Sequence, residues 1–359
     1  ARRLSATKYM SLFQQAAKAA DGEGAKVMLD RYFRFLFAFW IFASATTLSY
    51  SDAGAQGPLK KVRLGIAATS VGFLPIYTAY HRGFYKDEGI DLEIILMSLA
   101  AANNAFFKGE IDYSAGLTGL ALAAVRNYPA KILIFTVAKP LQSFVSRKEI
   151  KEPRDLRGKK VAGSSPGGSA TILAYRALRH FGLEPGKDVT VTPMGGSGAG
   201  RLAVLESGLV DASLLSVPEN IIAAQKGYHE LIFLGDIVTF PQNGFGASAQ
   251  RIQQQPDEVY RMVRATLRGL EFVMDDASRD QARDIMMKQW RVSDPKLADE
   301  MLRYLKRGLA KDAVINPEGV QYFVDLTRET SNITQPISAT QVVDFSFLDR
   351  ARKELHAAR

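Results

Sequence analysis

Short apolar segments that favour β-strands alternate with stretches of helical periodicity in the first half of the chain after residue 60. The strand-like segments lie at 62–67, 90–96, 111–114 and 131–137. The amphipathic segments lie at 75–83, 100–108 and 117–126. Strands that alternate with helices indicate βαβ units with parallel strands. We therefore expect a first α/β unit in this part of the chain.

The same alternation resumes further along and then stops. Strands are predicted at 161–163, 189–193, 211–215 and 230–234, and helices at 169–181, 201–207 and 219–226. After Gly246 the periodicity is helical only, with helices predicted at 256–274, 279–290, 295–307 and 317–330. A second α/β unit followed by a helical C-terminal part is the expected arrangement.

Two such units define two lobes that the chain connects twice. Connecting segments are expected near 140–146 and 239–247, so lobe 1 would comprise about 58–140 and 240–359, and lobe 2 about 141–239. Two connections between lobes form a hinge. The cleft between the lobes is the expected ligand site, because strand ends and helix starts converge there.

The N-terminal region carries a targeting pattern. Arg31 and Arg34 precede an apolar run at 35–43, and Ala53-Gly54-Ala55 follows. A basic region, an apolar core and an A-x-A site form a secretory signal, whereas a membrane-spanning helix needs roughly 20 apolar residues. We predict a signal peptide at 28–55, cleaved after Ala55, and a periplasmic mature protein at 56–359. We interpret residues 1–27 as a doubtful extension, because Met28 would be a conventional start.

Composition and charge exclude several classes of function. The sequence has no cysteine, which excludes disulfides, thiolate metal sites and cysteine nucleophiles. Its net charge of +9 is interspersed, as in Lys148-Glu149, rather than clustered as nucleic-acid binding requires. The four histidines form no closely spaced pair, and no recognisable catalytic motif occurs. We predict no catalytic residue, metal, cofactor or nucleic-acid partner.

The most informative motif is the small-residue segment from Gly163 to Thr171, between a predicted strand and a helix. Small residues let backbone N–H groups approach a ligand, and the start of a helix favours negative charge. It is not a Walker A loop, because Ser169 stands where lysine is required. An ordinary helix-capping turn is the alternative.

Three other strand ends carry similar residues, at 69–73, 114–119 and 216–219. Pro218 suits the first position of the following helix. Each segment alone is more often a turn, but their recurrence at strand-to-helix junctions strengthens the case for a ligand site. The glycine-rich segment 195–200 fails the dinucleotide fingerprint, because Arg201 replaces its third glycine, and is a cleft-rim loop or a connector.

Several motifs in consistent order resemble the SsuA/THI5-like (NMT1-type) substrate-binding proteins of ABC importers. They are the segments 72–77 and 83–93, the G-x-x-D step at 109–112, the D-L-k-G-K-k-v run at 155–161 and the L-x-x-G-x-v-D-A step at 205–212. Together these motifs extend the resemblance over about 61–272.

The resemblance implies a periplasmic-binding-protein type II fold, a monomer, and an ABC permease in the inner membrane as partner. Its ligands would be sulfonate, taurine, nitrate or thiamine-precursor-like molecules. The ligand contacts that it implies are Ser70, Phe73, Thr118, Ser165, Gly168, Ser169, Pro218 and Glu219. Glu219 argues against a purely anionic ligand, because it could accept hydrogen bonds from an amine or ring nitrogen. Alternatively, it is a solvent-facing carboxylate at a helix start.

Two other functions stay open at this point. Relatives with enzymatic activity share this fold, and a cysteine-independent enzyme is one alternative to a binding protein. A ligand sensor for a membrane receptor is the other. Hinge closure without bond chemistry is the preferred interpretation, so we expect a non-enzymatic solute-binding protein.

Overall fold

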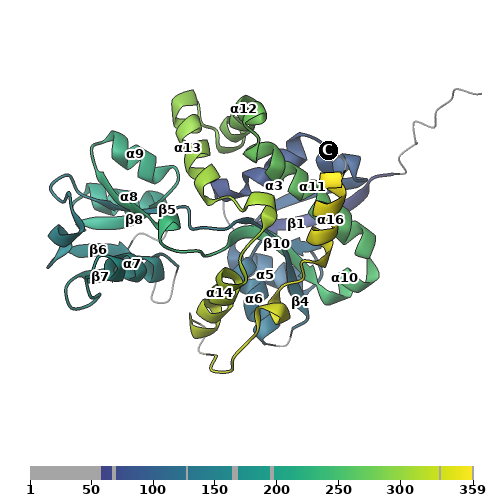
Figure 1. The fold of residues 1–359 in the computed structure, drawn as a ribbon, viewed down its shortest axis with the longest axis horizontal. Helices are drawn as coiled ribbons and strands as arrows, with labels where there is room; N and C mark the ends of the chain where they lie inside the picture. Colours follow the sequence, from purple (N-terminus) through teal and green to yellow (C-terminus); the bar gives the residue numbers. More distant parts are fainter. Residues whose placement is uncertain are drawn as a thin grey trace, which may run out of the picture. The chain divides into compact units, whose positions relative to one another are not determined.

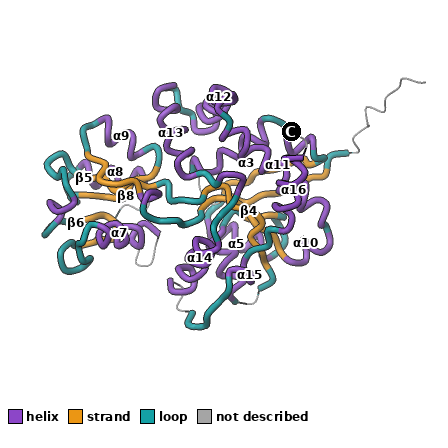
Figure 2. Tube along the Cα trace, in the orientation of Figure 1, coloured by secondary structure: helices purple, strands orange, loops and turns teal. Residues whose placement is uncertain are grey.

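The computed structural model describes residues 58–357, except 67–69, 127, 164–168, 195–197 and 331–332. The predicted extension at 1–27 and the predicted signal peptide at 28–55 lie outside the described residues. Within the described part, the strands form two five-stranded sheets, and helices surround both (Figure 1; Figure 2).

The first sheet has the strand order β2-β1-β3-β10-β4. Its strands are β2 (Ile90–Leu96), β1 (Lys60–Ile66), β3 (Tyr113–Ser114), β10 (Gln242–Ser248) and β4 (Ala130–Val137). β1 runs parallel to both β2 and β3, in register from Lys60 opposite Ile90. β10 runs antiparallel to β3 and β4. We call this sheet and the helices packed on it lobe one.

The second sheet repeats this plan with the order β7-β6-β8-β5-β9. Its strands are β7 (Thr190–Pro193), β6 (Lys160–Gly163), β8 (Ala212–Ser216), β5 (Gln142–Ser146) and β9 (His229–Phe233). β6 is parallel to β7 and β8, and β5 is antiparallel to β8 and β9. This sheet and its helices are lobe two.

The two segments expected to join the lobes are largely strands of the two sheets, and their pairing corrects the expectation of parallel strands. β5 follows β4 into the second sheet, and β10 follows β9 back into the first, so each sheet is mixed rather than parallel. The sequence of β10, Gln-Asn-Gly-Phe-Gly-Ala-Ser, has little β-propensity. Pairing with β4, rather than local preference, makes this segment a strand.

The helices of lobe one come from both ends of the described chain. The N-terminal ones are α3 (Leu74–His81), α4 (Phe84–Asp87), α5 (Leu99–Phe107) and α6 (Leu117–Val125). The later ones are α10 (Ala249–Gln254), α11 (Pro256–Met274), α12 (Arg279–Trp290), α13 (Pro295–Gly308), α14 (Pro317–Thr330), α15 (Ala339–Val342) and α16 (Ser346–Ala357). The expected helical C-terminal part is therefore confirmed, and α10, α15 and α16 are additions to it.

Lobe two has three α-helices, α7 (Ser169–His180), α8 (Gly198–Glu206) and α9 (Glu219–Gln225), within the part of the chain that the structure describes. Short 3-10 turns complete the fold: η1 (Val71–Phe73), η2 (Pro153–Leu156), η3 (Leu234–Asp236), η4 (Asp276–Ser278) and η5 (Lys311–Ala313). No helix among the described residues combines the length and apolar character needed to cross a membrane.

Each sheet packs against buried apolar residues, and the cluster of lobe one extends to Val217, Ile221 and Phe233 of lobe two. Leu64, Ile76 and Phe245 are fully buried in lobe one, and Phe144 and Leu214 are fully buried in lobe two. Burying one such side chain contributes about 1.5–3 kcal/mol.

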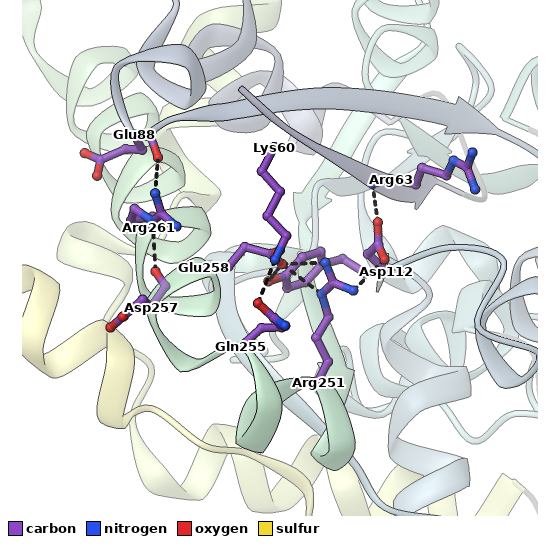
Figure 3. A network of polar contacts seen from close by, with 10 residues as sticks. Lys60, Arg63, Glu88, Asp112, Arg251, Gln255, Asp257, Glu258 and Arg261 are labelled. Carbon is purple, nitrogen blue, oxygen red and sulfur yellow. Dashed lines mark hydrogen bonds and ion pairs between the residues drawn. The ribbon is translucent and has the colours of Figure 1, made fainter. Parts of the chain in front are cut away.

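A buried charge network fixes the amino ends of β1 and β3 against the start of α11 (Figure 3). Glu258, 1% exposed, forms ion pairs of 2.6 Å with both Lys60 and Arg251. It also accepts a hydrogen bond of 3.0 Å from the Tyr113 hydroxyl. Arg251 pairs in addition with Asp112 at 2.5 Å. This network is a structural feature of lobe one.

Helix α13 contacts lobe two directly. The Tyr304 hydroxyl donates a 2.7 Å hydrogen bond to Glu230 on β9, and Arg307 forms a 2.7 Å ion pair with Asp236. The Arg307 guanidinium also lies 4.1 Å from the centre of the Phe233 ring. Helix α13 thus makes polar contacts with lobe two, in addition to the chain connections through β5 and β10.

Candidate functional site

In lobe one, the predicted residues follow the carboxyl ends of the parallel strands β1 and β3, which meet at one sheet edge. Ser70 is half-buried, and its Oγ accepts a 3.2 Å hydrogen bond from the Gly72 amide to cap η1. Thr118, the second residue of α6, is exposed. Phe73 is only 4% exposed and packs in the lobe-one core. Thr118 is therefore the most accessible of the three.

The crossing strand β10 brings Asn243 to this same turn. A Cβ placed on Gly72 would lie 2.1 Å from the Asn243 Oδ1 atom, so the Asn243 side chain would have to move to accommodate a larger residue. Asn243 adopts a φ of 27°, in the left-handed region that Asn tolerates better than most residues. The sequence analysis missed Asn243, because it lay in a segment expected to be a connection.

In lobe two, part of the predicted site cannot be placed. Ser165 and Gly168 lie outside the described residues, and for Ser169 the structure describes the backbone alone, at the start of α7. Just before this segment, β6 ends at Gly163. A Cβ on Gly163 would lie 2.6 Å from the Thr171 Oγ1 atom, so β6 and α7 approach closely. Thr171 is 8% exposed.

Pro218 and Glu219 lie where β8 ends and α9 begins. Pro218 occupies the N-cap position, after a cis bond to Val217, and Glu219 is the first helical residue. The expectation that Pro218 would be the first helical residue is wrong by one position. Both side chains are partly exposed.

The Glu219 carboxylate lies against the start of the neighbouring helix α8. A Cβ on Gly198, the first residue of α8, would lie 2.8 Å from the Glu219 Cδ atom. Free N–H groups and the helix dipole stabilise negative charge at such a position. The side chain of Glu219 therefore already occupies a place that suits an anion.

Arg201, on the first turn of α8, is a candidate site residue that the sequence analysis noted only as a missing glycine. Its side chain is buried, 6% exposed, and its Nε donates a 2.6 Å hydrogen bond to the Leu214 carbonyl on β8. Burial lowers the pKa of Arg201, and the charge of Glu219 partly offsets that effect. A buried arginine is rare without a counter-charge, but the sequence spacing does not reveal the partner.

Burial also disfavours the charged form of Glu219. Burial raises the pKa of the Glu219 carboxyl, and a backbone hydrogen bond and the Arg201 charge oppose the rise without cancelling it. The raised pKa means that the carboxylate lacks part of the solvation it would have in water. A perturbed acid at a strand end is typical of functional sites.

A hydrogen-bond chain connects this region to lobe one. Asn220, next to Glu219 on α9, donates to Ser143 on β5 at 3.0 Å, and Ser143 donates to Glu230 at 2.7 Å. Glu230 also accepts the Tyr304 hydroxyl of α13. Burial and the Glu230 charge raise the pKa of Tyr304 to about 12, so this hydroxyl stays protonated and can donate.

Other features of lobe one lie apart from these residues. A cavity of about 770 Å³ is lined by parts of α4, α11, η4, η5 and α16, and contains none of the predicted ligand residues. Near it, Glu271, Asp312 and His356 bring potential metal-ligating atoms within 4.8 Å of one another. The His356 Nε2 atom is 3.7 Å from Glu271, a separation that an ordinary ion pair also explains. We place the candidate ligand site at the strand ends, where both lobes contribute residues.

Comparison with known proteins identifies the class. The sequence model described as NMT1/THI5 like matches residues 70–279, more than half of the chain. The chain belongs to this family. A curated relative, the riboflavin-binding protein RibY of Chloroflexus aurantiacus, is 26% identical over 245 residues, which cover 65% of this chain and 68% of RibY.

Solved structures show the same fold. The periplasmic sulfonate-binding protein SsuA of Methylobacillus flagellatus KT superposes with a TM-score of 0.67 at 19% identity, covering 83% of this chain and 96% of its own. The desulfurization enzyme DSZB superposes with a TM-score of 0.62 at 17% identity, covering 84% of this chain and 100% of its own. The predicted type II periplasmic-binding fold, two α/β lobes with a helical C-terminal part, is thereby confirmed.

Proposed function

We propose that this chain is the exported solute-binding protein of an ABC importer, which captures a small molecule between its lobes and delivers it to a membrane permease. Family membership supports the general class, since RibY and SsuA are named as binding proteins. The observation that carries the proposal is the strand exchange: β5 and β10 are the segments by which the chain passes between the two sheets.

Strand exchange suits a hinge for a physical reason. A rotation of one lobe would change the backbone near the two crossings, and it would also change the contacts that Tyr304, Arg307 and the shared apolar cluster make between the lobes. Residues at the strand ends, among them Thr118 in lobe one and Glu219 in lobe two, would then meet the ligand from opposite sides. The ligand shifts the equilibrium by binding the closed form more tightly than the open one.

The proposal also covers export of the protein and its recognition by a permease. The predicted cleavage after Ala55 would release residues 56–359 into the periplasm, as a monomer. The closed, ligand-bound form would be the one that an inner-membrane permease recognises. No bound cofactor or metal is needed for capture and release.

The test uses the absence of native cysteine, which allows specific labelling. Lys108→Cys in lobe one and Lys187→Cys in lobe two are exposed positions for a donor and acceptor dye pair. A control pair, Lys108→Cys with Lys353→Cys, lies within lobe one. Ligand from a panel of sulfonates, nitrate, pyrimidines and riboflavin should change energy transfer in the first pair and leave the control pair unchanged. Binding without any such change would contradict hinge closure.

An enzyme is the second candidate, because DSZB shares the fold. It is the weaker one, since a chain without cysteine has no thiol nucleophile. Recovery of the bound compound after long incubation distinguishes the two. A binding protein returns it at unchanged mass, whereas an enzyme returns a product.

A further inference from the structure

The carboxyl end of α13 is bound to the segment by which the chain first leaves lobe one. The Gly308 carbonyl accepts hydrogen bonds from the Ala138 and Lys139 amides, at 2.8 and 3.2 Å, just after β4 ends. A Cβ on Gly308 would lie 2.4 Å from the Leu141 Cδ2 atom, so the backbone of α13 lies very close to this crossing. Backbone bonds and close packing therefore hold one end of α13 beside the hinge.

Side chains on the last turns of α13 reach lobe two. Tyr304 and Arg307 are three residues apart, so they lie on one face of the helix. The Tyr304 hydroxyl donates to Glu230 on β9 at 2.7 Å. Arg307 pairs with Asp236 of η3 at 2.7 Å, and its guanidinium lies 4.1 Å from the centre of the Phe233 ring. The Tyr304 and Phe233 ring centres are 5.7 Å apart, so polar and aromatic contacts join the lobes at one place.

This contact is buried and lies beside both halves of the candidate ligand site. Tyr304 and Phe233 are 8% and 2% exposed and belong to the apolar cluster that also contains Phe73 and Val217. α13 packs against η1, which follows the carboxyl end of β1, and against α9, which follows that of β8. Its position therefore affects how the two half-sites face each other. Polar bonds in such a place are strong, because little water competes for them.

We propose that α13 is a brace that limits how far the lobes open without ligand, with Tyr304 and Arg307 as positioning residues for ligand capture. The inference rests on the proposed solute-binding function and adds control of the hinge to it. Opening at the crossings would move Glu230 and Asp236 away from α13 and break both bonds. With the brace in place, the half-sites stay close together, so less of the binding energy of a ligand is used to close the lobes.

Energy transfer between single molecules labelled at Lys108→Cys and Lys187→Cys, measured without ligand, tests the brace directly. Arg307→Gln and Asp236→Asn each remove the ion pair, one from each lobe. Each should increase the population of more open molecules by about 2- to 5-fold, the range for a partly exposed pair. The double variant should shift the population by less than the sum of the single variants, because both remove the same pair.

Tyr304→Phe removes the second bond of the brace. It should increase the more open population by about 2- to 10-fold, the usual effect of losing one hydrogen bond. Its effect should add to that of Arg307→Gln, because the two side chains bond to different carboxylates. The phenyl ring keeps the contact with Phe233, so the change is confined to the hydroxyl.

Ligand affinity gives a readout that a merely structural role would not move. Binding is measured by calorimetry with ethanesulfonate, nitrate, 4-aminopyrimidine and riboflavin. Because the brace acts through the arrangement of the lobes, its loss should weaken every probe that binds by one common factor. That factor should equal the fall in the braced population. At saturating ligand the energy transfer should return to the wild-type value.

Lys306→Gln is the matched control on the same helix. Lys306 pairs with Asp276 at 2.8 Å, a bond of similar length to that of Arg307, but one that stays within lobe one. This variant should leave the ligand-free transfer and all affinities as in the wild type. A shift as large as that of Arg307→Gln would show that a general loss of charge, and not the contact between lobes, is responsible.

The outcomes separate the brace from the binding function. Unchanged ligand-free transfer in Arg307→Gln, Asp236→Asn and Tyr304→Phe would show that α13 does not restrain the lobes, while binding of a probe would leave the solute-binding function intact. Tighter binding in these variants would show that the contact opposes closure, which overturns the inference. If no form binds any probe, the solute-binding proposal is contradicted, and the ligand-free transfer still decides for or against the brace.

Discussion

Two glutamates, Glu258 buried in lobe one and Glu219 partly exposed in lobe two, show how the same residue type has different roles. Glu258 in lobe one contacts Lys60, Arg251 and Tyr113, at the amino ends of β1 and β3. Glu219 in lobe two follows the carboxyl end of β8 and has Arg201 as the cation that acts on it electrostatically. Ligand sites in parallel sheets lie at the carboxyl ends of strands.

The pKa values of these two glutamates shift in opposite directions. Burial raises the pKa of Glu258, but the hydrogen bond from Lys60 and the charge of Arg251 outweigh it, so the net pKa is lowered. For Glu219, burial prevails and the pKa is raised. The charges around Glu258 more than compensate for its burial and make it a stabilising element, whereas at Glu219 the charge of Arg201 does not outweigh burial.

The largest expected effect is on Glu258. Glu258→Gln should lower the free energy of unfolding by about 3–5 kcal/mol, because it leaves the Arg251 charge partly buried without its main partner. Urea denaturation followed by circular dichroism measures this loss. Glu149→Gln, a surface carboxylate 3.4 Å from Arg147 and 69% exposed, should change stability by less than about 0.5 kcal/mol. Equal losses in both variants would remove the distinction between structural and surface carboxylates.

An intermediate effect is expected where the lobes are joined. Tyr304→Phe removes the hydroxyl that donates to Glu230, and should lower stability by about 0.5–1.5 kcal/mol. It should also change the ligand-dependent energy transfer between the lobes. Tyr322→Phe is the control, because its buried hydroxyl has no hydrogen-bond partner among the described residues. A loss of similar size in the control would show that Tyr304 does not act through Glu230.

A smaller effect is expected for Glu219. Because burial already disfavours its charged form, Glu219→Gln should change the free energy of unfolding by less than about 1 kcal/mol. The same urea experiment measures it beside Glu258→Gln. A loss as large as that of Glu258→Gln would make Glu219 a structural residue and end the contrast between the two glutamates.

The smallest effect is a difference in pH dependence. The raised pKa of Glu219 gives stability that is complete below the unfolded pKa, near 4.5, and is lost as pH rises through the folded pKa. The lowered pKa of Glu258 gives stability that is present above about 4.5 and is lost as pH falls through its folded pKa. Relative to the wild type, Glu219→Gln should therefore become more stable as pH rises from 4 to 7. Urea titrations at four pH values check the sign, and a falling difference would contradict it.

Much of the fold could be predicted because its signals are local. α11 and α12 begin and end where the sequence analysis placed them, at Pro256–Met274 and Arg279–Trp290. Pro256 and Pro295 mark helix starts because proline fits the first helical turn. The strands β1, β2 and β4 were recognisable from their runs of β-branched and apolar residues.

The strands β5 and β10, by which the chain passes between the sheets, could not be predicted, because their signals are not local. β10 contains Gly244 and Gly246, and β5 is a five-residue strand with two serines, so neither shows the apolar pattern of a strand. Their conformation depends on partners far along the chain: Gly246 pairs with Ile132, and Phe144 with Leu214. Asn243 was missed with the strand that carries it.

By itself, then, the sequence determined the alternation of strands and helices, the family and the absence of thiol chemistry, since these depend on neighbouring residues and on residue types. Tertiary structure decided that both sheets are mixed and that Glu219 meets Gly198 and acts on Arg201. Those features arise from hydrogen bonds and charges between residues distant in the chain. Burial and neighbouring charges, which only the folded protein brings together, shift the pKa values of Glu219 and Glu258 in opposite directions.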